Sequence, residues 1–276
     1  MLVHIVPSRS SLNLLTLFLL LCTFLTVPNK LQGQREMNLN LVKETIGTER
    51  RLALVIGNKA YQHIGQLVNT TNDADDMAAV LSSLGFDVIL RKDLSKEELN
   101  NVIDEFGNRL NQYETGLLYY SGHGVLHMNE DYLVPVDAQL KSPLELEDTC
   151  VDLGRIMRKM KKANVRVSLA FIDTSRVCFE TTLEQRYVPQ TRCLRNKPPG
   201  SFVAFATRAG DTADDNVHGR NGLFTSELLH HLRTPNLGIR EILDRTTLGV
   251  SARSDMMQIP SRNDELTEDF KFLVTN

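Results

Sequence analysis

Continuous apolar runs alternate with amphipathic segments along most of the chain. The runs lie at residues 52–57, 87–90, 116–121, 165–172 and 202–206. Runs of this kind are typical of strands that are buried on both faces, as in a parallel sheet. A shorter run at 132–136 contains Pro135. Because proline cannot donate to a strand ladder, a short edge strand is expected there.

Segments with helical spacing of apolar residues separate these strands. The first, 73–84, follows an Asn/Thr-rich stretch that offers an N-cap and ends at Gly85. Ser95 and Glu98 form a capping box that opens a second helix, which runs to about Leu110. Further helices are expected at about 151–160, 223–232 and 239–250. This alternation predicts one α/β domain with a mainly parallel sheet and helices on both faces.

The first 49 residues differ in kind from the rest. An apolar run over 14–27 has the length of a signal-peptide core and is short for a spanning helix. We interpret 1–34 as a signal peptide or an uncleaved signal anchor, 35–49 as a linker and 50–276 as the folded domain. The expected location is secreted or periplasmic after cleavage, and membrane-anchored without it.

Composition and charge narrow the function classes. The 276-residue chain is 42% hydrophobic, with a net charge of −3 and intermixed acids and bases. That excludes a broad basic field for nucleic acid. The cysteines beyond the leader, Cys150, Cys178 and Cys193, have no metal-ligand spacing, so no metal or other cofactor is predicted. A Cys178 to Cys193 bridge and free structural cysteines stay as alternatives.

Two strand ends carry side chains suited to chemistry. Ser121-Gly-His-Gly124 ends the third strand and Asp173-Thr-Ser-Arg176 ends the fourth. In open α/β sheets, ligand sites lie outside the carboxyl ends of the strands. A histidine between two glycines can approach a substrate closely, as a general acid must. A lone histidine in a turn is more often structural or solvated, so the second strand end decides the interpretation.

Several motifs occur in the order and spacing of one peptidase family. They are Leu54-Val-Ile-Gly-Asn58, Asn72-Asp-Ala74, Leu84-Gly-Phe86, Tyr119-Tyr-Ser-Gly-His-Gly124, Leu133-Val-Pro-Val-Asp137, Asp173-x-x-Arg176, Ala204-Phe-Ala-Thr207, Gly219-Arg-Asn-Gly222 and Phe224-Thr-Ser226. Over about residues 50–273 the chain resembles the caspase-like peptidases, most closely their paracaspase and bacterial caspase-homologue branch. The resemblance implies a caspase-like three-layer sandwich. The Asp-x-Cys-Arg pattern of that branch fits better than the Asp-x-Cys-His pattern of metacaspases, so no calcium requirement is carried over.

The resemblance places a serine at the position of the nucleophile. In that family a histidine after the third strand and a cysteine after the fourth form a dyad, and here these are His123 and Ser175. A serine hydroxyl is far less acidic than a thiol and needs a base that a third group orients. Nothing in the sequence identifies such an acid. We therefore predict a pseudopeptidase; the alternative is a slow Arg/Lys-specific endopeptidase that performs proteolysis through Ser175 or Cys178.

The resemblance also implies a basic-residue pocket and an oxyanion hole. Asp73, Asp173 and Asp215 would line the pocket for the P1 side chain, where carboxylates clasp a guanidinium through paired hydrogen bonds. Each of these acids also has a common structural explanation. In the same order, these are an acid at a helix start, a turn former at a strand end and a solvated loop acid. Gly124 and the backbone N–H of Ser175 would supply the oxyanion hole.

The combined prediction is an exported caspase-fold pseudopeptidase. Its expected partner is a peptide or protein with exposed arginine or lysine, or an active caspase-like relative. The basic polar loop 177–200 would offer self-cleavage sites in an active relative and is a candidate to occupy the pocket in cis. A scaffold that assembles through its sheet edge is the third hypothesis. Asn69-Thr-Thr71 is a glycosylation sequon that matters only in a eukaryotic secretory pathway.

Overall fold

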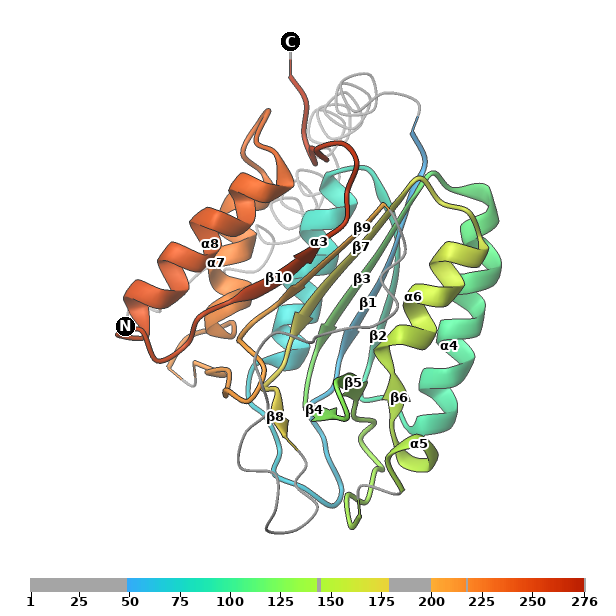
Figure 1. The fold of residues 1–276 in the computed structure, drawn as a ribbon, viewed down its shortest axis with the longest axis vertical. Coiled ribbons are helices and arrows are strands. Elements are labelled where there is room, and N and C mark those ends of the chain that lie inside the picture. Colours follow the sequence, from blue (N-terminus) through green and yellow to red (C-terminus); the bar gives the residue numbers. More distant parts are fainter. Residues whose placement is uncertain (1–48, 143–144, 179–199, 217, 276) are drawn as a thin grey trace, which may run out of the picture. The chain divides into compact units, whose positions relative to one another are not determined.

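A six-stranded sheet in the order β10-β9-β7-β3-β1-β2 forms the centre of the computed structural model (Figure 1). Five strands are parallel, and β10 runs antiparallel to β9. Their bounds are β1 (Arg51–Gly57), β2 (Phe86–Lys92), β3 (Thr115–Ser121), β7 (Val167–Asp173), β9 (Ser201–Phe205) and β10 (Ser261–Asp264). All residues of β1, β3, β7 and β9 are buried, which confirms the inference from their continuous apolar runs.

Helices cover both faces of this sheet (Figure 1). One face packs against α3 (Thr70–Ser83), α7 (Leu223–Leu232) and α8 (Ile239–Arg253). The other packs against α4 (Lys96–Arg109), followed by a 3-10 turn at Leu110–Gln112, and α6 (Leu153–Lys162). Successive residues of β1 enter the two cores alternately, because strand side chains point to opposite faces. The predicted three-layer α/β sandwich, with a mainly parallel sheet between two layers of helices, is confirmed.

The structure describes residues 49–142, 145–178, 200–216 and 218–275. The interpretations of 1–34, of nearly all of the linker and of most of the 177–200 loop therefore concern residues outside this part. Within it, no helix has the length and apolar character needed to cross a membrane.

A second, small sheet corrects the prediction for residues 132–136. It contains β4 (Gly124–His127), β5 (Glu130–Leu133), β6 (Val151–Asp152) and β8 (Val177–Cys178) in the order β6-β5-β4-β8. The expected edge strand is wrong, because β5 pairs on both sides and ends before Pro135. The expected helix at 151 begins two residues later, because Val151 and Asp152 pair with β5. A short helix, α5 (Leu146–Thr149), precedes β6.

Local signals at the helix ends have mixed outcomes. The Ser95/Glu98 capping box at α4 is confirmed, and Gly85 ends α3 with a φ of 82°. Asn69 occupies the N-cap position of α3, but its side chain makes no capping bond to the helix. That side chain has other partners, which lie in a loop more than 140 residues along the chain.

Candidate active site

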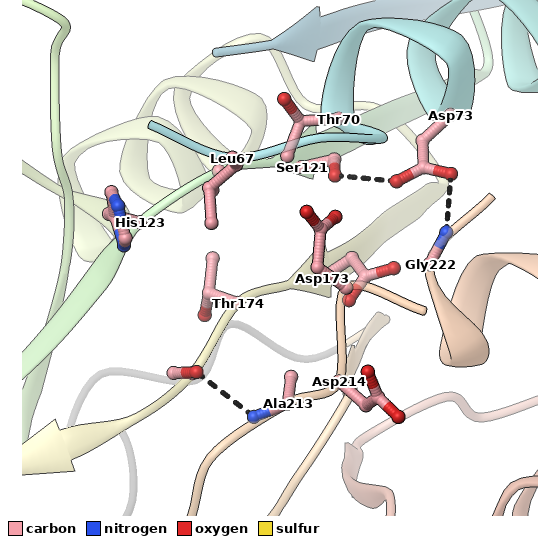
Figure 2. Close-up of a pocket in the computed structure, with 13 residues that line it drawn as sticks. Leu67, Thr70, Asp73, Ser121, His123, Asp173, Thr174, Ala213, Asp214 and Gly222 are labelled. Atoms are coloured by element: carbon pink, nitrogen blue, oxygen red, sulfur yellow. Dashed lines mark hydrogen bonds between the residues drawn. The ribbon is translucent and has the colours of Figure 1, made fainter. Parts of the chain in front are cut away.

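The pocket that gathers the predicted residues lies at the carboxyl ends of β3 and β7. The start of α3 and the loop after β9 complete its wall (Figure 2). Its lining includes Asp73, Ser121, His123, Asp173, Ser175 and Asp215. Residues that are far apart in sequence meet here because parallel strands end at one edge of the sheet. The structure thus brings together every side chain assigned to the site by resemblance, while their roles stay predictions.

His123 is oriented by a backbone carbonyl. Its Nε2 lies 2.7 Å from the carbonyl oxygen of Gly65, and its ring packs on Tyr61 with the centroids 4.5 Å apart. The Tyr61 hydroxyl also accepts a hydrogen bond from the His123 N–H. A nitrogen that faces a carbonyl must carry the proton, so in the neutral imidazole Nδ1 is the acceptor. A neutral carbonyl fixes the ring, but it adds no charge to stabilise an imidazolium.

The hydroxyl of Ser175 is bonded to a neighbouring loop. Its Oγ accepts a hydrogen bond from the N–H of Ala213 at 2.9 Å, the dashed line to Ala213 in Figure 2. Within the described residues, no hydrogen bond joins Ser175 to His123, although both line one pocket. A serine nucleophile needs a base within hydrogen-bond reach. The alternative nucleophile, Cys178, lies on β8 opposite Leu126 of β4.

Two glycines flank His123 because their surroundings leave no room for a side chain. A Cβ on Gly122 would lie 2.7 Å from the hydroxyls of Tyr61 and Tyr120. A Cβ on Gly124 would lie 2.7 Å from Oγ1 of Thr174, the residue that precedes Ser175. The two strand ends are therefore packed directly against each other.

Gly124→Ala is expected to destabilise the domain by about 1–3 kcal/mol, because overpacking a tight contact carries a penalty of that order. The clash also pushes Thr174, and with it the adjoining Ser175 backbone. Urea unfolding of this variant, beside Gly65→Ala, measures the effect. A Cβ on Gly65 would lie more than 4 Å from every atom outside this residue and its two chain neighbours, so Gly65→Ala is the matched control. Equal stability of the two variants would contradict the close packing of Gly124 against Thr174.

Two buried carboxylates form the floor of the pocket. Asp73 accepts hydrogen bonds from Ser121 Oγ at 3.0 Å and from Gly222 N at 2.9 Å. Asp173 accepts from the hydroxyl and the N–H of Thr225 at 2.6 and 3.2 Å. Among the described residues, no lysine or arginine pairs with either carboxylate. The described residues also contain no group of three or more His, Cys, Asp or Glu side chains that could hold a metal ion.

Burial and the charge of a neighbouring carboxylate raise the pKa of both carboxyls above the ordinary value. Burial, followed by the charge of Asp173, raises the pKa of Asp73 to about 8. Burial also raises the pKa of Asp173 to about 6, against the hydrogen bonds from Thr225. A cation in the pocket would reverse both effects, because an opposite charge favours the ionised form.

Asp215 is held in a different way. Its carboxylate accepts hydrogen bonds from the N–H groups of Val68 and Asn69, at 2.5 and 3.2 Å. It is half-buried and lies on the pocket wall. Asp215 is therefore not a freely solvated loop acid. Its carboxylate lies next to the N-terminus of α3.

Arg176 is a structural residue of the site. Its guanidinium, 2% exposed, makes paired bonds of 2.7 and 2.9 Å to Asp131 and lies 3.9 Å from the ring centroid of Phe205. Its backbone exchanges hydrogen bonds with Gly210 and Asp211. Arg176 therefore links the backbone next to Ser175 to both sheets. Its position in the Asp-x-x-Arg motif did not predict this structural role.

The glycosylation sequon begins at a buried side chain. Asn69 is 2% exposed, and its Nδ2 donates to backbone carbonyls. Since Nδ2 is the atom to which a glycan would be attached, the folded domain does not present this sequon for modification.

Comparisons with known proteins agree with this geometry. Residues 50–271 match the family model of the caspase domain. A region of 126 residues is 32% identical to mucosa-associated lymphoid tissue lymphoma translocation protein 1 of Homo sapiens, and covers 46% of this chain and 15% of that protein. A region of 99 residues is 28% identical to caspase-12 of Mus musculus, and covers 35% of this chain and 23% of that protein. The match therefore spans less than a quarter of either relative.

A solved structure shows the same fold. Caspase-1 from Spodoptera frugiperda superposes with a TM-score of 0.61 at 21% identity, over 82% of this chain and 90% of that one. At this identity the likeness concerns the arrangement of strands and helices rather than the chemistry.

Proposed function

Since this chain belongs to the caspase-domain family, we propose that it is a catalytically impaired member that binds peptide segments with an exposed arginine or lysine. One observation carries the proposal: Asp73 and Asp173 are buried at the floor of the pocket, and within the part of the chain that the structure describes their partners are hydroxyl and amide donors. Burying a carboxylate without a cation is unfavourable, and buried carboxyls with shifted pKa values in a cleft are characteristic of functional sites, which supports a binding role for this pair.

The impairment rests on the nucleophile position. Ser175 Oγ is bonded to Ala213 N, and His123 is oriented by the uncharged carbonyl of Gly65. Neither contact activates a hydroxyl in the way that an acid-oriented histidine does. What is left is a pocket that can hold a basic side chain without cleaving the bond next to it.

The occupant is proposed on chemical grounds. A guanidinium offers donors in a planar fork that matches carboxylates, and an ammonium offers a single point charge. Such a group is available on any protein that exposes an arginine-containing segment, an active caspase-like relative included. Export of the chain is a separate proposal that rests on the apolar run at 14–27 alone.

Asp173→Asn is expected to abolish the preference of the pocket for arginine. Fluorescence anisotropy measures this preference with two labelled peptides that differ at one position, where one has arginine and the other its uncharged isostere citrulline. The wild type should bind the arginine peptide about 10- to 100-fold more tightly, the usual effect of one to two charged hydrogen bonds. The variant should bind both peptides alike.

Asp75→Asn is the matched control, because it removes the same charge from α3 outside the pocket, where Asp75 pairs with Lys92. Equal binding of the two peptides by the wild type would favour the scaffold hypothesis. Cleavage of the arginine peptide by the wild type would favour the endopeptidase.

A further inference from the structure

The loop formed by residues 214–216 and 218–222 is hydrogen-bonded along one side of α3. Four polar residues at the start of this helix, spaced i, i+3, i+4 and i+7, occupy one helical face. They are Asn69, Asn72, Asp73 and Asp76, and each bonds to the loop. We name these four residues the α3 clasp.

Asn69 is the buried centre of the clasp. Its Nδ2 donates to the carbonyl oxygens of Asp215, Asn216 and Gly219 at 2.7, 2.9 and 3.2 Å. An amide has two N–H donors, so the three carbonyls share them. The backbone N–H of Asn69 also donates to Oδ1 of Asp215. One asparagine therefore holds both the main chain and the carboxylate of the same acidic residue.

The bond from Gly222 N to Asp73 is also buried, whereas the contacts of Asn72 and Asp76 lie nearer the surface. Asn72 donates to the carbonyl of Arg220 at 3.2 Å, and the guanidinium of Arg220 makes two bonds of 2.8 Å to Asp76. The Arg220 side chain is 63% exposed. Exposed pairs of this kind contribute little to stability, so the hold on the loop depends mainly on Asn69 and on the buried bond from Gly222 N to Asp73.

We propose that Asn69 is a positioning residue that keeps Asp215 in the pocket wall and thereby sets how strongly the pocket selects a basic side chain. This inference rests on the proposed function for its consequence in binding, but not for the positioning itself. A half-buried carboxylate on a loop otherwise turns toward water. Here the Val68 and Asn69 N–H groups hold it from one side, while the Asn69 amide holds its backbone from the other.

Hydrogen exchange of the Val68 amide tests the positioning without any peptide. That amide donates to Asp215 and should be protected only while Asp215 stays in place. Asn69→Ser is the variant of choice, because serine is as good an N-cap as asparagine but reaches at most one carbonyl; Asn69→Ala is the second. Exchange should accelerate at least about 10-fold in either variant, and stay unchanged in Asn72→Ala, which removes a neighbouring contact of the clasp.

A double-mutant cycle on arginine-peptide affinity tests the consequence. Asn69→Ser should weaken binding of the arginine peptide about 5- to 10-fold and leave the citrulline peptide unaffected. In the Asp215→Asn background it should add nothing, since contacting residues that act through one another are not additive. Unchanged Val68 exchange, or fully additive losses, would overturn the proposal. If the wild type fails to distinguish the peptides, the proposed function is wrong, and the exchange result still decides the positioning role.

Discussion

Ser175→Cys is expected to raise hydrolysis of an arginine peptide by at least about 1,000-fold, because loss of a nucleophile in hydrolytic enzymes lowers the rate by that order or more. The substitution replaces one oxygen atom by sulfur and leaves the other residues of the site unchanged. His123 is already fixed with Nδ1 as its acceptor, and the buried carboxylates are in place. A thiol, with an ordinary pKa near 8.5, ionises far more easily than a hydroxyl and needs no charged third residue behind the histidine.

The environment of the new sulfur favours its anion. The N–H of Ala213, which donates to Ser175 Oγ, would donate to the thiolate and stabilise it. The larger sulfur lengthens this contact and can move toward the ring of His123. We therefore expect the gained activity to require the histidine.

A fluorogenic peptide with arginine before the scissile bond measures the effect. The wild type, Ser175→Cys and Ser175→Cys with His123→Ala are compared, and Ser175→Ala serves as the matched loss of the hydroxyl. Activity in the wild type that disappears in Ser175→Ala would show a working serine and contradict the proposed impairment. Activity that survives there but disappears in Cys178→Ser would identify the downstream cysteine.

The sequence predicts the five parallel strands of the main sheet, because each contains a continuous apolar run, but it misses the edge strand β10, whose four residues are all polar. The small sheet was also missed. Its strands have only two to four residues, and β6 and β8 exist only as pairs with β5 and β4. The strand expected at 132–136 included Pro135, but β5 ends at Leu133, and it could not be placed without its two partners.

The candidate site divides in the same way. The strand ends that carry His123 and Asp173 could be singled out from residue type and strand position, whereas Asp73, Asp215 and the role of Ser175 were assigned by the resemblance to the caspase-like peptidases. The groups that orient His123 and Ser175 could not be predicted, because they are the backbone carbonyl of Gly65 and the backbone N–H of Ala213. Every residue has such groups, so only the fold shows which of them meet.

Asp73→Asn is expected to stabilise the free protein at neutral and alkaline pH while it weakens arginine binding. In the unfolded chain this carboxyl titrates near 3.8, and in the folded protein burial and Asp173 raise its pKa to about 8. Between these values the folded state holds more protons than the unfolded state, so the free energy of unfolding falls as the pH rises. The penalty is absent below pH 3.8 and complete above about pH 8.

Asparagine removes this charge and keeps the local bonds: its Oδ1 can accept from Gly222 N, and its Nδ2 can donate to Ser121 Oγ. Urea unfolding should show a gain of about 1–3 kcal/mol at pH 8 that shrinks toward zero near pH 4. Asp75→Asn, on the exposed side of α3, should show no such trend. A loss of stability at pH 8 would mean that Asp73 stabilises the fold rather than serving to bind the ligand. The expected gain, together with weaker binding of the arginine peptide, would mean that the domain keeps a destabilising carboxylate because binding requires it.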